Sequence, residues 1–101
     1  MVADKWQQLQ VDVGEWSDAT FPQPILAKNK AAHLVEEAQE VYEDPDDIME
    51  YADCIMLLLD AARISGFSAE DLYQATLKKL EINKARKWGE RDERGVVNHV
   101  D

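Results

Sequence analysis

The sequence contains few residues that cross-link, break or anchor a chain: one cysteine, four glycines and three prolines among 101 residues. A lone Cys54 excludes an intramolecular disulfide, and its apolar neighbours predict a buried, inert thiol in a reducing cytosol. The longest apolar run, Cys54–Leu59, is far too short to span a membrane, and the first residues lack the apolar segment of a signal peptide. We therefore expect one cytoplasmic domain with no membrane partner.

Positive charge is also scarce, because 11 Lys and Arg face 21 Asp and Glu, for a net charge of −10. A protein that binds a nucleic-acid backbone needs a basic face, so this balance argues against DNA as a partner. A nucleotide remains compatible, since metal ions can bridge an acidic protein to an acidic ligand. A chain of this length fills only a thin core and buries about 60–70% of its unfolded surface, so oligomerisation would help it.

Apolar residues recur at helical spacing, and no alternation typical of strands persists, so the sequence predicts an all-α domain of four helices. We expect the helices at about residues 3–17, 25–42, 45–65 and 69–87. Residues 1–88 would form the domain, and residues 89–101 a polar C-terminal tail without regular structure.

Several local signals set the expected helix ends and faces. Asp44 would cap the third helix, with Pro45 at its first position and Asp47 in its first turn. Gly66 would end that helix, and Ser68 with Asp71 resembles a capping box for the fourth. The third helix is apolar nearly all round, which predicts a central position. The first helix carries an apolar stripe of Trp6, Leu9, Val13 and Trp16.

The dominant chemical feature is Glu36-Glu37-x-x-Glu40 followed by Glu50-x-x-Asp53, five carboxylates within eighteen residues. Each group shares a helix face, and a short linker would bring the second and third helices together as an antiparallel hairpin. The facing carboxylates would repel one another unless they took up protons or bound cations. Mg²⁺ prefers such hard oxygen ligands and keeps positions for substrate phosphates.

Other interpretations of these residues stay open. Acidic runs are usually solvated faces, although Glu50 and Asp53 stand beside apolar residues, where an uncompensated carboxylate is costly. Asp60 follows Asp53 by seven residues and could reach the site or a neighbouring subunit. His33 precedes Glu36 in the reverse of the Glu-x-x-His order of di-iron bundles, so we expect it to pack or to line a substrate edge.

The last expected helix carries Lys79, Asn83 and Arg86 at i, i+4 and i+7, on one face. Such a line suits a phosphate chain, although cations also favour the C-terminal end of a helix for electrostatic reasons alone. Trp16 and Phe21 lie where the first helix gives way to a loop, and they are candidates for bordering a base at a pocket mouth.

Together these motifs resemble the signature of the MazG-like all-α nucleoside triphosphate pyrophosphohydrolases. The resemblance covers roughly residues 6–88 and includes His33–Glu40, Lys79-x-x-x-Asn83-x-x-Arg86 and the closing run Asn83–Gly89. It is strongest to the small phage and bacterial dATP/dGTP diphosphohydrolases, the branch with the MazZ-type enzymes. One departure is the spacer between the two acidic motifs, which is often longer in the family.

The resemblance implies a four-helix MazG-like bundle, assembled as a homodimer or homotetramer with sites between subunits. It implies hydrolysis of a (deoxy)nucleoside triphosphate, with a purine such as dGTP or dATP expected, to the monophosphate and pyrophosphate in the cytoplasm, the host's if the protein is viral. Mg²⁺, with Mn²⁺ as an alternative, would bind Glu36, Glu37, Glu40, Glu50 and Asp53. Glu37 is the expected general base, with Glu40 as a second catalytic carboxylate, and Lys79, Asn83, Arg86 and Trp16 would bind substrate. The rival hypothesis is a non-catalytic acidic helical module that binds a basic partner or cations.

Overall fold

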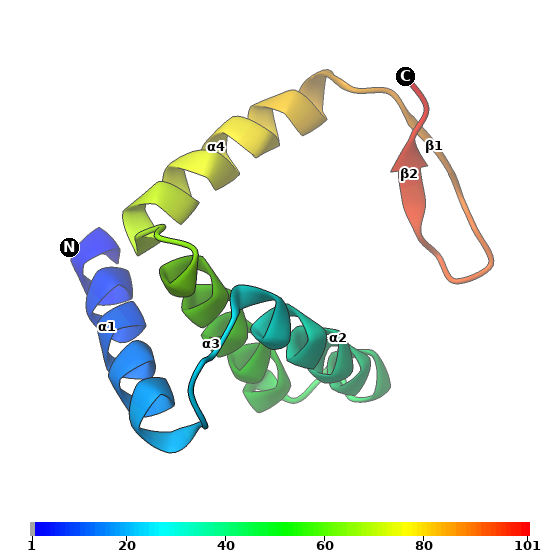
Figure 1. The fold of residues 1–101 in the computed structure, drawn as a ribbon. Coiled ribbons are helices and arrows are strands. Elements are labelled where there is room, and N and C mark those ends of the chain that lie inside the picture. The colour runs from blue at the N-terminus through cyan, green and yellow to red at the C-terminus, as the bar shows by residue number, and fades with distance from the viewer. Residues whose placement is uncertain (1) are drawn as a thin grey trace.

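The computed structural model describes residues 2–101 and contains four helices followed by a small β-hairpin (Figure 1). The helices are α1 (Val2–Thr20), α2 (Ala27–Glu43), α3 (Ile48–Ile64) and α4 (Ala69–Ala85). The four expected helices are confirmed, with ends that differ by a few residues. α3 is central, as expected, because it packs against α1, α2 and α4.

A tight turn joins α2 to α3 and makes them an antiparallel hairpin, the most extensive helix pair in the chain. The prediction that Asp44 caps α3 is wrong. Asp44 ends α2 and opens a four-residue turn, in which the Asp47 N–H donates to the Asp44 carbonyl at 3.2 Å. Pro45 takes the second position of that turn, where its fixed φ is favoured, so the helix starts later. Asp47 is the true cap, and its carboxylate accepts from the Met49 N–H at 2.9 Å.

The C-terminal end of α3 forms as the sequence predicts. Gly66 has a φ of +91°, and the Phe67 and Gly66 N–H groups donate to the carbonyls of Ala62 and Arg63. This is the Schellman arrangement, which requires a residue in the left-handed region at that place. Ser68 and Asp71 then exchange side chain to backbone hydrogen bonds, which confirms the capping box of α4.

The face of α1 that packs on α3 differs from the expected apolar stripe. From Asp4 onward, the buried residues of α1 are Gln10, Val13, Gly14 and Ser17, whereas Trp6, Leu9 and Trp16 are each at least 38% exposed. Gln10 explains the difference: its amide donates to the carbonyls of Leu59 and Phe67, both at 3.0 Å, where α3 ends. The contact between α1 and α3 therefore needs polar and small side chains rather than large apolar ones.

α4 extends away from the other helices and carries the hairpin at its far end (Figure 1). The expectation that residues 89–101 lack regular structure is wrong, because β1 (Trp88–Arg91) pairs antiparallel with β2 (Val97–His99). Their turn is held by Asp92, whose carboxylate accepts from the N–H groups of Arg94 and Val96, and by Gly95 at φ +80°. The radius of gyration is 15.7 Å, against about 13 Å for a compact chain of this length.

No helix within residues 2–101 is long and apolar enough to cross a membrane.

The role of Gln10 can be tested by replacing it with alanine. We expect the free energy of unfolding to fall by about 2–3 kcal/mol, because the Phe67 carbonyl loses its partner and the Leu59 carbonyl loses one. Urea denaturation measures this change. Gln8→Ala is the matched control, since Gln8 lies on the exposed face of α1 and bonds only its helix neighbour Asp12, and it should change stability by less than about 0.5 kcal/mol. Equal losses in the two variants would contradict the interpretation.

Candidate functional site

Three carboxylates of the predicted metal set converge where α2 and α3 face each other. Glu37, Glu50 and Asp53 each place one oxygen so that all three oxygens lie within 4.8 Å of one another. Glu37 and Glu50 are half-buried, but Asp53 is exposed, so the expected apolar enclosure of Asp53 is not found in the single chain. The α2–α3 hairpin, rather than either helix alone, creates this cluster.

The electrostatics of the cluster favour a cation. Burial raises the pKa of Glu50, and the negative charges of Glu40, Asp47, Asp53 and Glu37 raise it further. Protonation of Glu50 or binding of a divalent ion would relieve this repulsion. Converging carboxylate oxygens are the donors that Mg²⁺ and Mn²⁺ prefer, so the residues present fit such an ion.

The neighbouring thiol of Cys54 is free and half-buried rather than fully buried. Burial and the same carboxylates raise its pKa. The thiol therefore stays protonated and is a poor nucleophile, in line with the expected inert role.

Glu36 and Glu40 belong to the same motif but do not join the three-carboxylate group. Each residue of a helix advances about 100°, so turning Glu37 toward α3 leaves Glu36 and Glu40 on the exposed side of α2. Glu40 remains close enough to raise the pKa of Glu50. Their roles as metal ligands stay predictions.

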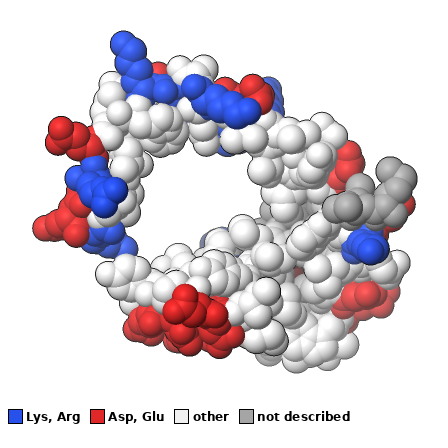
Figure 2. Space-filling view, turned by 180° about the vertical axis from the view of Figure 1, so that it is seen from behind, with Lys and Arg blue, Asp and Glu red and all other residues white. Residues whose placement is uncertain are grey.

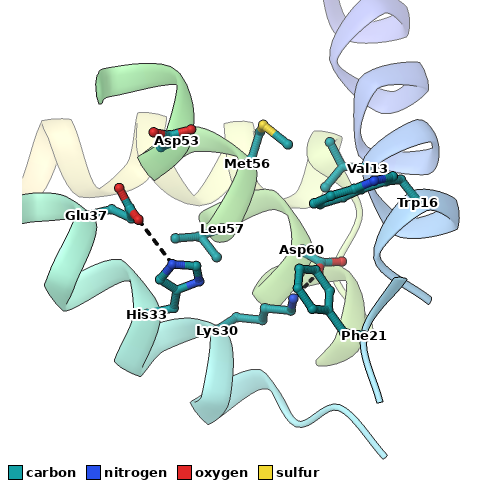
Figure 3. Close-up of a pocket in the computed structure, with 10 residues that line it drawn as sticks. All are labelled: Val13, Trp16, Phe21, Lys30, His33, Glu37, Asp53, Met56, Leu57 and Asp60. Atoms are coloured by element: carbon teal, nitrogen blue, oxygen red, sulfur yellow. Dashed lines mark hydrogen bonds and ion pairs between the residues drawn. The ribbon is translucent and has the colours of Figure 1, made fainter. Parts of the chain in front are cut away.

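A cavity of about 150 Å³ adjoins the carboxylates (Figure 3). Trp16 and Phe21, the two aromatic residues predicted at a pocket mouth, both line it, with ring centroids 5.3 Å apart in an edge-to-face arrangement. The other lining residues are Val13, Lys30, His33, Glu37, Asp53, Met56, Leu57 and Asp60. His33 borders the cavity, as one of its expected roles requires, with its Nε2 3.1 Å from Glu37. One end of the cavity is therefore acidic and the other aromatic.

The aromatic end contains a buried ion network centred on Asp60, which is 2% exposed. Its Oδ1 accepts from Arg63 at 2.8 Å, and its Oδ2 lies 3.4 Å from Lys30 Nζ. Arg63 reaches on to Asp18 at the end of α1. The Ser17 hydroxyl is buried beside this carboxyl and forms no hydrogen bond with the described residues.

Two opposing effects set the pKa of Asp60. Burial raises it, but the adjacent Ser17 hydroxyl, the hydrogen bond from Arg63 and the charges of Arg63 and Lys30 outweigh burial. The pKa of this carboxyl therefore lies below its ordinary value, and Asp60 is ionised at neutral pH.

Sequence reasoning missed Lys30 and Arg63. A signal for Lys30 existed, because Lys30 precedes Glu37 by seven residues as Asp60 follows Asp53 by seven. A seven-residue spacing keeps two residues on one helix face. Arg63 could not be found this way, since its role depends on Gly14 of α1: a Cβ there would lie 2.5 Å from the Arg63 side chain.

The predicted phosphate-binding residues of α4 do not line the cavity of the same chain. Lys79 is exposed, and Asn83 and Arg86 are half-buried near the hairpin, where the Asn83 carbonyl accepts from the Trp88 indole at 2.9 Å. Figure 2 shows the Lys and Arg side chains of the α4 side across an open space from a group of Asp and Glu side chains. Substrate binding by these residues stays a prediction.

Comparison with solved structures places the fold of this chain in the MazG-like class of pyrophosphohydrolases. A MazG-like pyrophosphohydrolase from Cyanophage S-2L matches with a TM-score of 0.73 and 32% identity, over 93% of this chain and 95% of that one. That protein was solved with dGDP and three catalytic Mn²⁺ ions per active site. Within this class, the chain belongs to the dATP/dGTP pyrophosphohydrolase family, whose model matches residues 9–101.

Curated relatives come from phages. The Eaa protein of Salmonella phage P22 is 42% identical over 86 residues, and the dATP/dGTP diphosphohydrolase of Cyanophage S-2L is 32% identical over 94 residues. The match covers 83% of this chain but 26% of the P22 protein, and 92% of this chain and 86% of the S-2L protein. A dATP/dGTP diphosphohydrolase of Salmonella phage PMBT28 is 33% identical over 87% of this chain and 29% of its own length. The chain thus spans less than a third of two of these relatives.

The Asp60 network predicts a specific pH dependence of stability. Because the folded-state pKa of Asp60 is lowered, its contribution is complete above the unfolded pKa of about 3.9 and is lost as the pH falls through the folded value. Asp60→Asn should cost about 3 kcal/mol at pH 7, since it leaves two cations without their buried partner, and less at pH 3.5. Urea denaturation at the two pH values measures this difference.

Asp18→Asn is the control, because Asp18 pairs with the same guanidinium from a side chain that is 55% exposed. It should cost less than about 1 kcal/mol at either pH. A cost of Asp60→Asn that stays constant or grows on acidification would contradict the assignment.

Proposed function

We propose that this protein hydrolyses dATP and dGTP to the monophosphate and pyrophosphate with Mg²⁺ or Mn²⁺ as cofactor. The observation that carries the proposal is the convergence of Glu37, Glu50 and Asp53 at one end of a cavity whose other end is aromatic. Family membership and the dGDP- and Mn²⁺-bound structural relative support the same chemistry. The phage relatives fit a role in a nucleotide pool in the host cytoplasm.

In this reaction the oxygen of a water forms a bond to the α-phosphorus, and the bond from that phosphorus to the bridging oxygen of the β-phosphate breaks. Pyrophosphate leaves, and the deoxynucleoside monophosphate remains. Glu37 takes the proton of the water on a carboxylate oxygen, because it faces both the cavity and the other carboxylates. A divalent ion bound by Glu37, Glu50 and Asp53, with Glu36 and Glu40 as further predicted ligands, supplies Lewis acidity and neutralises phosphate charge.

The aromatic end of the cavity would contact the base, and a second copy of the chain would help to bind the phosphates. Trp16 and Phe21 border the base. α4 leaves exposed apolar side chains, among them Tyr73, Leu77 and Leu80, and α3 leaves Ile55 and Leu58 exposed. Burying these side chains in a homodimer or homotetramer would be favourable. It would also let Lys79, Asn83 and Arg86 of one copy reach the phosphates held by the carboxylates of another.

Turnover of single nucleotides tests the proposed reaction. With Mg²⁺ the protein should convert dGTP and dATP to monophosphate and pyrophosphate, and a chelator should stop turnover. Glu37→Gln and Asp53→Asn should each lower kcat at least about 10²-fold without unfolding the protein, because each removes a group that the chemistry needs. Chromatography of the nucleotides and a pyrophosphate assay give the products and the rates.

Glu43→Gln is the matched control, since it removes the same charge near the end of α2, outside the cluster, and should leave kcat unchanged. Release of orthophosphate, or no turnover by protein that binds Mg²⁺, would overturn the proposal. No turnover combined with no nucleotide-dependent thermal shift would favour the non-catalytic acidic module instead.

Mixed oligomers test whether two copies build one site. Coexpressed Glu37→Gln and Arg86→Ala chains, each inactive alone, should regain roughly a quarter of wild-type activity if they form random symmetric dimers, because one site in each mixed dimer is intact. The control pair is Glu37→Gln with Asp53→Asn, which lie in the same cluster and restore no site. Activity no greater than that of the control pair would show that each chain supplies its own cations.

A further inference from the structure

Lys30 is a buried cation that the proposed hydrolysis does not use. It is 7% exposed, with its Nζ 3.4 Å from Asp60 Oδ2 and 4.0 Å from the centroid of the Phe21 ring. The first contact is an ion pair and the second a cation–π contact, and no side-chain hydrogen bond from this ammonium to a described residue is formed. An ammonium has three N–H donors, so Lys30 keeps donors for a ligand.

These donors lie at the aromatic end of the cavity, away from the carboxylates of Glu37 and Asp53 (Figure 3). Lys30 and Glu37 are seven residues apart on α2, which is about 10 Å along the helix. The apolar and aromatic lining of the cavity is supplied by Phe21, Trp16, Val13, Met56 and Leu57. A cavity near 150 Å³ accommodates an aromatic ring, and its apolar and aromatic lining suits a flat heterocycle better than a phosphate.

Asp60 lines the same cavity, but both of its oxygens face cations of the same chain. One of its oxygens accepts from Arg63 at 2.8 Å, the other faces Lys30, and the Ser17 hydroxyl lies beside them. Asp60 is therefore a positioning residue, which holds the Lys30 ammonium at this end of the cavity beside Phe21. Lys30 is a cavity residue with unused donors at this end, and it can recognise a base that presents an acceptor.

Adenine and guanine differ at position 6, where one carries a donor and the other an acceptor, but both carry an acceptor at N7. Resting on the proposed function, we propose that Lys30 is a specificity residue that donates a hydrogen bond to N7 of the substrate purine. One cationic donor that contacts N7 alone meets an acceptor in both dATP and dGTP. Cytosine and thymine have no corresponding ring nitrogen, so the same donor discriminates against dCTP and dTTP.

The test compares dGTP with 7-deaza-dGTP, in which a C–H replaces N7. Wild-type protein should hydrolyse the 7-deaza nucleotide with a kcat/KM about 10–100-fold lower, the loss expected for a hydrogen bond to a charged donor. Lys30→Met keeps the length of the side chain without its donors, so it should lower kcat/KM for dGTP and dATP by a similar factor. In that variant dGTP and 7-deaza-dGTP should become equivalent.

Lys28→Met is the matched control, because Lys28 is an exposed lysine of the same helix outside the cavity lining, and it should keep the full discrimination. The wild-type comparison needs no variant, so it stands even if Lys30→Met folds poorly in a thermal melt. Equal kcat/KM for the two nucleotides with wild-type protein would overturn the proposal. A Lys30→Met variant that slows purine and pyrimidine nucleotides equally yet still discriminates against 7-deaza-dGTP would assign Lys30 to the phosphates.

Failure of the proposed hydrolysis would be a separate result, recognised by the absence of turnover with every nucleotide. Calorimetric titration of dGTP and 7-deaza-dGTP in the presence of Ca²⁺ then measures the same discrimination as a ratio of Kd values. A weaker Kd for 7-deaza-dGTP that disappears in Lys30→Met supports the base contact, and equal Kd values with wild-type protein overturn it.

Discussion

The arrangement of α1, α2 and α3 depends on one buried carboxylate, Asp60 of α3. It accepts from Arg63, pairs with Lys30 of α2, and through Arg63 is linked to Asp18 of α1. Replacing a buried ion pair by well-packed apolar side chains is often neutral for stability, so the net energy of the network is a weak reason for its presence. Its effect is geometrical: the buried charges are satisfied only when the three helices meet in one way, and that way opens the cavity beside Phe21 and Trp16.

The two ends of the cavity shift the pKa of their carboxyl groups in opposite directions. At the Asp60 end, a buried anion is matched by cations of the same chain, and its pKa is lowered. At the other end, oxygens of Glu37, Glu50 and Asp53 lie within 4.8 Å of one another, and the pKa of Glu50 is raised. The first end is complete within the protein, whereas the second needs a metal ion or protons. A nucleoside triphosphate suits such a cavity, because its metal-bound phosphates match the acidic end and its base matches the aromatic end.

Much of the fold followed from local signals. The four helices, the Gly66 stop and the Ser68–Asp71 box depend on residues close in the sequence, and each formed as predicted. The errors arose where a distant contact or a competing local structure decided. Pro45 is as favourable in a β-turn as in the first turn of a helix, so its presence did not decide between them. The Asp92–Gly95 turn lies in a polar segment that has no apolar pattern to indicate strands. The apolar stripe of α1 was misread because Gln10 satisfies carbonyls that only the folded α3 end presents.

The sequence by itself determined the acidic motifs, their helical placement and the family to which they belong. Spacing along a helix fixes which residues share a face, and that information is local. Only the tertiary structure decided that oxygens of Glu37, Glu50 and Asp53 converge, with Glu40 near enough to raise the pKa of Glu50. It alone joined Lys30 to Asp60, because the rotation of two packed helices about their axes is set by the whole interface. The same interface brings the carboxylates together as an acidic centre and forms the aromatic cavity beside it.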